Sequence, residues 1–238
     1  MALFGRGKRR GAASGEGCPD HDPCSRLAGI PVRELDSRLR LVVTPIADLG
    51  SDSITAQLGG GLAALLVAMG APGTARAHAV PAHFTPHWNS TPPDLLARAL
   101  RNMEHDRLAI ETLAGGNGGP ALHVVTGQDG LPGAGHVLRL EQVLGQKLPH
   151  GALVAMPSSN RFYAVPIHSG DDLSLLDPLV SAVRGLAEHG PVLSQDAFWL
   201  HDGQLDPLNA TVKDGELRYF PSDAFKQLLP QLRRDSTR

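Results

Sequence analysis

The sequence ALVAMPSSNRFYAVP, from Ala152 to Pro166, carries a strong signal for the fold of this chain. Two apolar runs, residues 152–156 and 162–166, flank the polar segment 157–161. Short apolar runs separated by turn-forming residues are typical of two strands joined as a β-hairpin. The stretch therefore predicts an antiparallel strand pair.

Further strands are predicted on both sides of this hairpin. They fall at residues 38–43, which Pro45 ends, at 122–126 and at 198–201, before an Asp202-Gly203 turn. A last hairpin is predicted around Asp214-Gly215. The run 62–69 fits a buried strand or a buried helix equally, because its alanines and leucines favour helix while its short length between glycines favours strand.

Helices are predicted where apolar residues recur every three or four positions. One spans 93–113, after the capping residues Ser90 and Thr91 and a proline pair. The others span 134–146, 173–189 (ended by Gly190-Pro191) and a C-terminal segment from Ser222. Together the elements predict a single α+β domain with a mixed, mainly antiparallel sheet and three to four helices.

The two ends of the chain differ in composition from its body. Residues 1–30 are rich in glycine, proline and charge, which predicts a disordered tail that folding does not need. The domain then covers 31–232, and 233–238 form a second basic tail. Residues 1–10 and 233–238 together hold seven of the 22 basic residues and one of the 24 acidic ones, so 15 basic and 23 acidic residues remain between them. An acidic body is a poor surface for nucleic acid, which leaves weak electrostatic contact through the tails.

No run approaches the roughly 18 apolar residues that a membrane span needs. The basic start is not followed by the apolar core of a secretory signal, and both cysteines lie near the N-terminus. These features predict a cytoplasmic protein without an integral membrane segment.

The middle of the chain resembles a known bacterial family. The hairpin at 152–166, the following helix, Gly190-Pro191-Val192-Leu193-Ser194, Phe198-Trp199-Leu200 and Asp202-Gly203 are similar in order to the YtpQ-like family, the domain of unknown function 1444. The similarity runs from about residue 33 to 208. It departs at the turn 158–161, where the family often carries an acidic or polar residue beside arginine. The resemblance implies that 62–69 and 75–80 form a hairpin across Pro72-Gly73, and it implies no active site.

Two clusters could be proposed as metal sites, and neither has suitable spacing. Cys18 and Cys24 are separated by five residues, whereas zinc sites usually separate paired cysteines by two to four. His78, His83 and His87 lie near prolines that exclude a regular helix, and strand alternation places the first two on opposite faces. We therefore interpret the three histidines as surface residues and the two cysteines as reducible thiols in a tail. The sequence predicts no metal and no cofactor.

Catalytic patterns are equally unspecific. Ser158, Ser159 or Ser194 could combine with His168 or His201 and with Asp171, Asp172 or Asp202, but spacing fixes no geometry. Asp171 and Asp172 are equally suited to the N-terminal charge of a helix. The glycine-rich segments 115–119 and 127–135 match neither the P-loop nor the dinucleotide pattern.

The sequence therefore favours a binding or adaptor module with an unidentified protein partner and no catalytic residues. Arginine, tyrosine and tryptophan are enriched where protein interfaces concentrate their energy. The predicted contact surface comprises Ser158, Ser159, Asn160, Arg161, Tyr163, Trp199 and His201. A hydrolase built on serine, histidine and aspartate from separate loops is the alternative, and an accessory held through its basic ends is a third.

Overall fold

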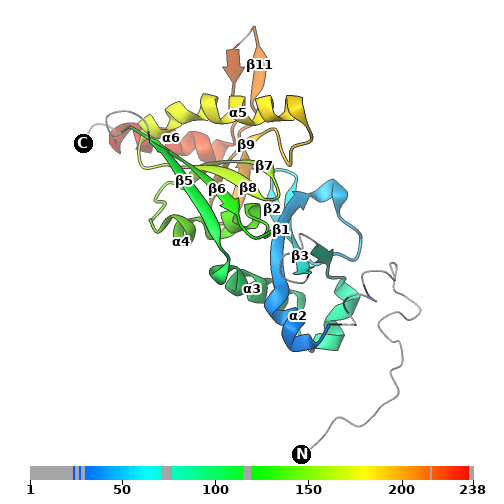
Figure 1. Ribbon diagram of the computed structural model, residues 1–238. Helices are drawn as coiled ribbons and strands as arrows, with labels where there is room; N and C mark the ends of the chain where they lie inside the picture. The colour runs from blue at the N-terminus through cyan, green and yellow to red at the C-terminus, as the bar shows by residue number, and fades with distance from the viewer. Residues whose placement is uncertain are drawn as a thin grey trace, which may run out of the picture.

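A computed structural model describes Cys24, Leu27 and residues 30–70, 77–114, 119–214 and 216–235 (Figure 1). The predicted fold class is confirmed, since the chain forms an α+β body whose sheets are antiparallel. The described residues contain five α-helices, more than the three to four expected. None of these helices is long and apolar enough to cross a membrane.

A six-stranded antiparallel sheet forms the centre of the molecule, in the order β10-β9-β7-β8-β6-β5. Its strands are β5 (Leu108–Ala114), β6 (Ala121–Gly127), β7 (Ala152–Ser158), β8 (Arg161–Pro166), β9 (Ala197–His201) and β10 (Gln204–Pro207). The hairpin predicted from 152–166 is confirmed as β7 and β8, and the strand at 198–201 as β9.

At β7 both faces of this sheet are buried, which explains why this strand is apolar over most of its length rather than alternating. Ala152, Val154 and Met156 belong to one core cluster, while Leu153 and Ala155 belong to another. Because side chains alternate between the faces of a strand, one continuous apolar run supplies both cores.

A second sheet packs over the first face. It contains β1 (Leu39–Pro45), β3 (Leu62–Met69) and β2 (Thr55–Gly59) in that order, with β4 (Ala77–Ala79) also paired to β3. The strand interpretation of 62–69 is confirmed, and β4 pairs with it antiparallel as the predicted hairpin requires. The Pro72-Gly73 turn itself lies outside the described residues.

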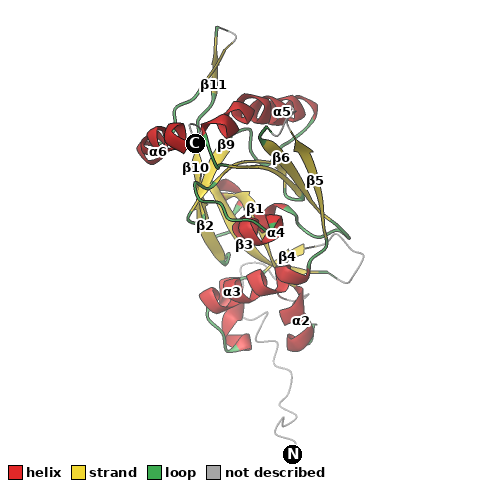
Figure 2. Cartoon of the chain, turned by 90° about the vertical axis from the view of Figure 1, so that its left-hand side faces the viewer, coloured by secondary structure: helices red, strands yellow, loops and turns green. Residues whose placement is uncertain are grey.

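Helices cover the two outer sides of the molecule (Figures 1 and 2). The helices α5 (Leu176–His189) and α6 (Asp223–Asp235) cover the second face of the central sheet, with the 3-10 helix η7 (Gly170–Leu175) leading into α5. The helices α2 (Val32–Arg38) and α3 (Pro92–Asn102) pack near β1 at the other end. The predicted last hairpin is confirmed as β11 (Thr211–Lys213) and β12 (Glu216–Arg218), which projects beyond α5.

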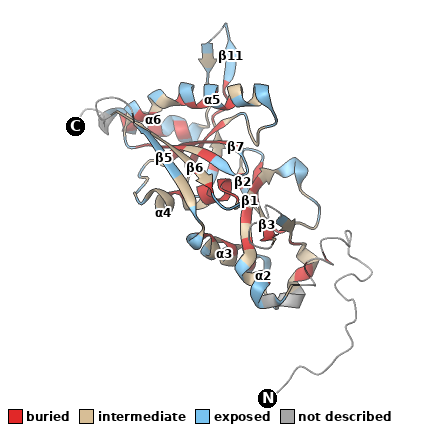
Figure 3. Ribbon diagram, viewed as in Figure 1, coloured by how far each residue is buried: buried red, intermediate tan, exposed pale blue. Residues whose placement is uncertain are grey.

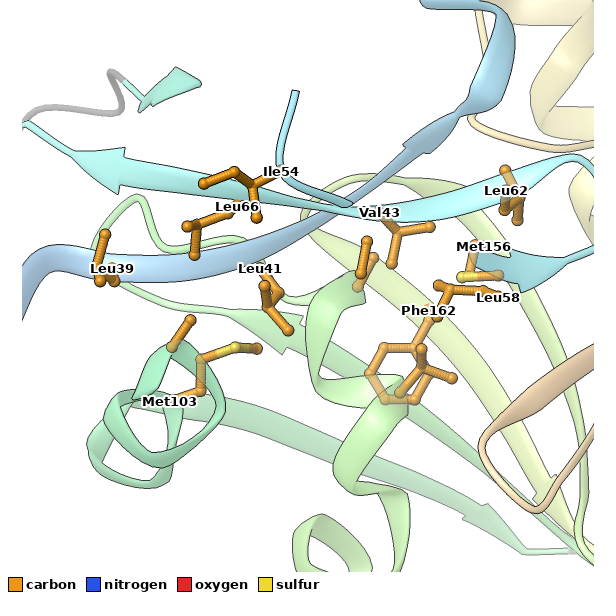
Figure 4. Packing of buried hydrophobic residues seen from close by; sticks show 14 of the residues in the cluster. Leu39, Leu41, Val43, Ile54, Leu58, Leu62, Leu66, Met103, Met156 and Phe162 are labelled. Atoms are coloured by element: carbon orange, nitrogen blue, oxygen red, sulfur yellow. The ribbon is translucent and has the colours of Figure 1, made fainter. Parts of the chain in front are cut away.

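The larger core lies between the two sheets. Leu39, Leu41 and Val43 project from β1 toward the side of the central sheet that carries Phe162, with Met103 alongside (Figure 4). Burial is concentrated in this layer and in the one under α5, while the outer helix faces and the projecting hairpin are exposed (Figure 3). Phe162 is fully buried, so its ring anchors β8 between the layers.

The helix predicted over 93–113 is correct only in its first half. Thr91 caps α3 in a capping box with Asp94, but α3 ends at Asn102, and the short 3-10 helix η4 (Met103–His105) follows it. Residues 108–114 are instead the edge strand β5, paired along its length with β6. Pairing with β6 prevails over a helical pattern that the sequence carries only weakly in this part.

The helix predicted over 134–146 is also shorter and more irregular than expected. Residues Ala134–Arg139 form the 3-10 helix η6, and only Leu140–Leu144 form the α-helix α4, which Gly145 ends in a left-handed conformation. The sequence did not predict β2, α2 or the 3-10 helix η3 (Ala82–Trp88).

The N-terminal boundary of the domain differs from the prediction at two positions. Cys24 and Leu27 are fully or almost fully buried and belong to the larger core cluster, although both fall within the predicted tail. They are helical and three residues apart, so they lie on one face of a helix. The rest of residues 1–29 lies outside the described part of the chain.

We therefore expect Leu27→Ala to lower the free energy of unfolding by about 2–5 kcal/mol, the range for truncating a buried leucine. Urea unfolding monitored by circular dichroism measures it. Leu3→Ala, in the predicted tail, is the matched control and should change stability by less than about 0.5 kcal/mol. A Leu27→Ala protein as stable as the control would show that this residue is not part of the core in solution.

Candidate functional site

The seven residues predicted as a contact surface do not lie together. Ser158, Asn160 and Arg161 line one groove, whereas Trp199 and His201 line a separate pocket. Ser159 and Tyr163 line neither of these two sites.

The first site, here called the hairpin groove, lies between the β7–β8 turn and the end of α5. It has a volume of about 350 Å³ and is lined by Pro157, Ser158, Asn160, Arg161, Leu186, His189, Gly190, Pro191 and Val192. The segment after α5 is held against β7 by two backbone hydrogen bonds: Leu193 N–H donates to the Pro157 carbonyl at 3.0 Å, and Ser194 N–H donates to that of Met156 at 3.2 Å. Both walls of the groove are thus fixed by the main chain.

The tip of the hairpin is also fixed from behind, by the glycine-rich loop 127–133. The Asn160 carbonyl accepts from Gly127 N–H at 2.9 Å, and the Ser159 carbonyl accepts from Ala134 N–H at 3.0 Å. A Cβ atom on Gly133 would lie 2.1 Å from the Asn160 carbonyl oxygen, so only glycine allows this approach. In the segment 127–133, which was compared above with a phosphate-binding loop, glycine therefore serves to let the loop pack against the hairpin.

Asn160 is less available for a partner than the sequence suggested. With its amide nitrogen turned toward the loop, the side chain donates to the carbonyls of Leu131 at 2.6 Å and Gly127 at 3.2 Å. Its amide is therefore used to hold the turn.

Arg161 and Leu186 are the exposed side chains that give the groove its chemistry. Arg161 is exposed, and its Nε donates to the hydroxyl of Thr126 on β6 at 3.1 Å, which holds the guanidinium in place. Leu186, on α5, is 42 % exposed although it is a large apolar side chain. The groove therefore offers a fixed cation next to an apolar wall.

Tyr163 and Trp199 are largely core residues. Trp199 is 7 % exposed and belongs to the cluster under α5 and α6, where its ring lies edge-on to Phe225 at a centroid distance of 5.2 Å. Its indole N–H donates to the His150 carbonyl at 2.8 Å. Tyr163 is half-buried against the same cluster, on the sheet face opposite to Phe162.

His201 marks the second site, a pocket of about 530 Å³ next to α4 and α6. Its ring stacks on Trp199 with centroids 3.7 Å apart. Glu141 also lines this pocket, but its carboxylate accepts from Leu148 N–H at 3.0 Å, and this hydrogen bond holds the pKa of Glu141 below its usual range. The carboxylate is thus used to close the turn after α4.

The structure does not assemble the serine–histidine pairs considered for a hydrolase. None of Ser158, Ser159 and Ser194 is hydrogen-bonded to His168 or His201 in the structure. The Asp172 carboxylate accepts from the N–H groups of His168 and Ser169 at 2.8 Å each, so it caps η7. A pocket of about 410 Å³ beside this cap also contains His123, and burial lowers the pKa of His123.

Sequence reasoning missed one cluster, formed by Cys24, His83 and Asp52. The Cys24 sulfur lies 3.1 Å from His83 Nε2, and His83 Nδ1 contacts a carboxylate oxygen of Asp52. His83 is therefore not a plain surface histidine; it lies on η3, whereas His78 lies on β4. The side chain of His87 and all of Cys18 lie outside the described residues. No local signal could have found this cluster, because its members are far apart in the chain.

Comparison of the chain with protein-family models, with curated proteins and with solved structures finds no match. The resemblance to the YtpQ-like family stays a prediction. Within the described ranges, no three histidine, cysteine or acidic side chains are arranged to hold a metal ion.

Proposed function

We propose that the protein is a binding module that holds a protein partner through the hairpin groove. The observation that carries the proposal is the pairing of an exposed, oriented guanidinium with an exposed leucine across a groove with fixed walls. Arginine beside apolar surface is a common composition for the energetic centre of an interface.

The fixed walls support this function because they reduce the entropy lost on association. Backbone hydrogen bonds hold the segment 193–194 to β7, and the loop 127–133 holds the turn from the other side. A groove that is already ordered loses little conformational freedom when it binds. The partner surface that fits presents a carboxylate or carbonyl group to Arg161 and an apolar side chain to Leu186.

The charge of the body agrees with a partner of this kind rather than with nucleic acid. The chain has 22 basic and 24 acidic residues, and seven of the basic ones lie within residues 1–10 and 233–238. A polyanion would be repelled by the remaining surface, whereas a single acidic side chain can be held by one guanidinium.

We expect Arg161→Ala and Leu186→Ser each to weaken partner binding by about 1–3 kcal/mol while leaving the fold intact. The partner is first captured with the full chain as bait, and its dissociation constant is then measured by calorimetry for each variant. Arg218→Ala, on the exposed strand β12, is the matched control and should bind as the unchanged protein does.

Wild-type affinity in both groove variants would mean that the partner binds elsewhere. The hydrolase alternative has its own test, because turnover on an esterase, phosphatase or nuclease panel that is lost with His201→Ala would replace the binding proposal.

A further inference from the structure

Cys24, His83 and Asp52 form a linear relay that the proposed binding function does not use. The three residues come from the N-terminal segment, from η3 and from the segment before β2. The imidazole lies between the other two, with Nε2 facing the sulfur at 3.1 Å and Nδ1 facing the carboxylate. This order of thiol, imidazole and carboxylate is the arrangement by which proteins activate a cysteine.

Each member has a defined part in that arrangement. The Asp52 carboxylate accepts the N–H at Nδ1, which leaves Nε2 without a proton and able to take one from the thiol. The thiolate that results lies beside an imidazolium, which stabilises its negative charge. His83 is the base, and Asp52 is a positioning residue because it acts only through the imidazole.

Burial restricts what can react with this sulfur. Cys24 has no exposed surface, whereas the side chains of His83 and Asp52 are each 28 % exposed. The relay thus extends from solvent to a sulfur inside the core. A sulfur without exposed surface is closed to disulfides and peptides, whereas small uncharged reagents such as hydrogen peroxide and iodoacetamide need only a small local opening.

We propose that Cys24 is a modification site that small hydroperoxides oxidise to a sulfenic acid. The thiolate attacks one peroxide oxygen, so an S–O bond forms as the O–O bond breaks. Sulfur loses two electrons and the peroxide gains them. The proton held on His83 passes to the departing hydroxide, and the products are the sulfenic acid and water.

The modification also changes the packing of the N-terminal segment. Cys24 and Leu27 belong to the core cluster that includes β1 and β3. An added oxygen atom is polar and needs space at a position that has no exposed surface. Oxidation should therefore loosen the contact of this segment with the core.

The test uses the full chain with Cys18→Ser, which leaves Cys24 as its single thiol. Iodoacetamide alkylation of the folded protein at pH 7 is followed by mass spectrometry, and the peroxide-treated protein is then unfolded in urea with dimedone present, which labels sulfenic acids once the sulfur is exposed. An ordinary thiol is only about 3 % thiolate at pH 7. We expect the alkylation rate to fall roughly ten- to thirtyfold in His83→Gln, with dimedone labelling lost in the same variant.

Asp52→Asn should reduce both signals, and Asp52→Glu, which keeps a carboxylate, should retain more of each. His105→Gln, an exposed histidine on η4, is the control and should change neither. Circular dichroism checks that each variant is folded.

Three results would overturn the proposal. His83→Gln and Asp52→Asn could react at the rate of the parent protein. The thiol could be inert to iodoacetamide and to peroxide until the protein is unfolded in urea, which would make Cys24 a packing residue. Finally, the purified protein could contain stoichiometric zinc that protects Cys24 until a chelator removes it, which would make the sulfur a metal ligand.

Discussion

Asp106→Ala should destabilise the protein by about 3–5 kcal/mol, the range for removing one partner of a buried ion pair. The side chain of Asp106 is 1 % exposed and that of Arg40 is 12 % exposed. Arg40 Nε donates to both carboxylate oxygens, at 2.8 and 3.0 Å. Without the carboxylate, the guanidinium would stay in the core with its charge uncompensated.

The pair joins elements that are far apart in sequence. Arg40 is on β1, and Asp106 lies in the loop between η4 and β5, where His136 of η6 also approaches the carboxylate at 3.3 Å. The His136 side chain is 1 % exposed, and its Nδ1 has no hydrogen-bond partner among the residues that the structure describes. The Asp106 carboxylate is therefore the hydrogen-bond partner of two buried side chains, the Arg40 guanidinium and the His136 imidazole.

Urea unfolding of Asp106→Ala measures the effect. Glu104→Ala, on an exposed position of η4, is the matched control and should stay within about 0.5 kcal/mol of the parent protein. The double variant Arg40→Met, Asp106→Leu should recover most of the loss, because replacing a whole buried pair by apolar side chains is often neutral. An Asp106→Ala protein as stable as the control would indicate that water reaches Arg40.

Trp199→Ala should lower the free energy of unfolding by about 3–5 kcal/mol, as expected for a large aromatic side chain removed from a core. The ring is 7 % exposed, packs edge-on to Phe225, and donates its N–H to the His150 carbonyl. The loss combines a cavity under α6 with a carbonyl that loses its donor.

The control for this prediction is His201→Ala, two residues along the same strand. His201 covers the Trp199 ring and is 30 % exposed, so its removal should cost less than about 1 kcal/mol. Thermal and urea unfolding of the two variants measure how much stability each substitution removes. If Trp199→Ala keeps the stability of His201→Ala but loses partner binding, Trp199 is a contact residue, as the sequence suggested, rather than a core residue.

Both predictions concern contacts that no local pattern in the sequence could reveal. The attraction between Arg40 and Asp106 exists only because β1 passes next to the loop before β5. Trp199 illustrates the same limit, since tryptophan is common in both cores and interfaces. Only the placement of α5 and α6 over β9 assigns it to the core.

The helix predicted over 93–113 failed for a related reason. Its first half has the cap, the prolines and the apolar spacing that specify a helix locally, and α3 forms there. Its second half has no comparable signal, and Leu108–Ala114 instead pairs along its full length with β6. The state of such a segment depends on whether a strand is available beside it.

Local sequence patterns were sufficient to predict the hairpin at 152–166, the strand at 198–201, the cap of α3, the end of α5 and the mainly antiparallel α+β class, whereas they left 62–69 open between strand and helix. These features rest on turn residues, caps and apolar spacing within a few residues of one another. Tertiary structure alone decided that β7 lies between β8 and β9, that the predicted contact residues separate into two sites, and that Cys24 meets His83 and Asp52. Those outcomes depend on which distant segments come into contact, and the free energy of such contacts is not encoded in any short stretch of the chain.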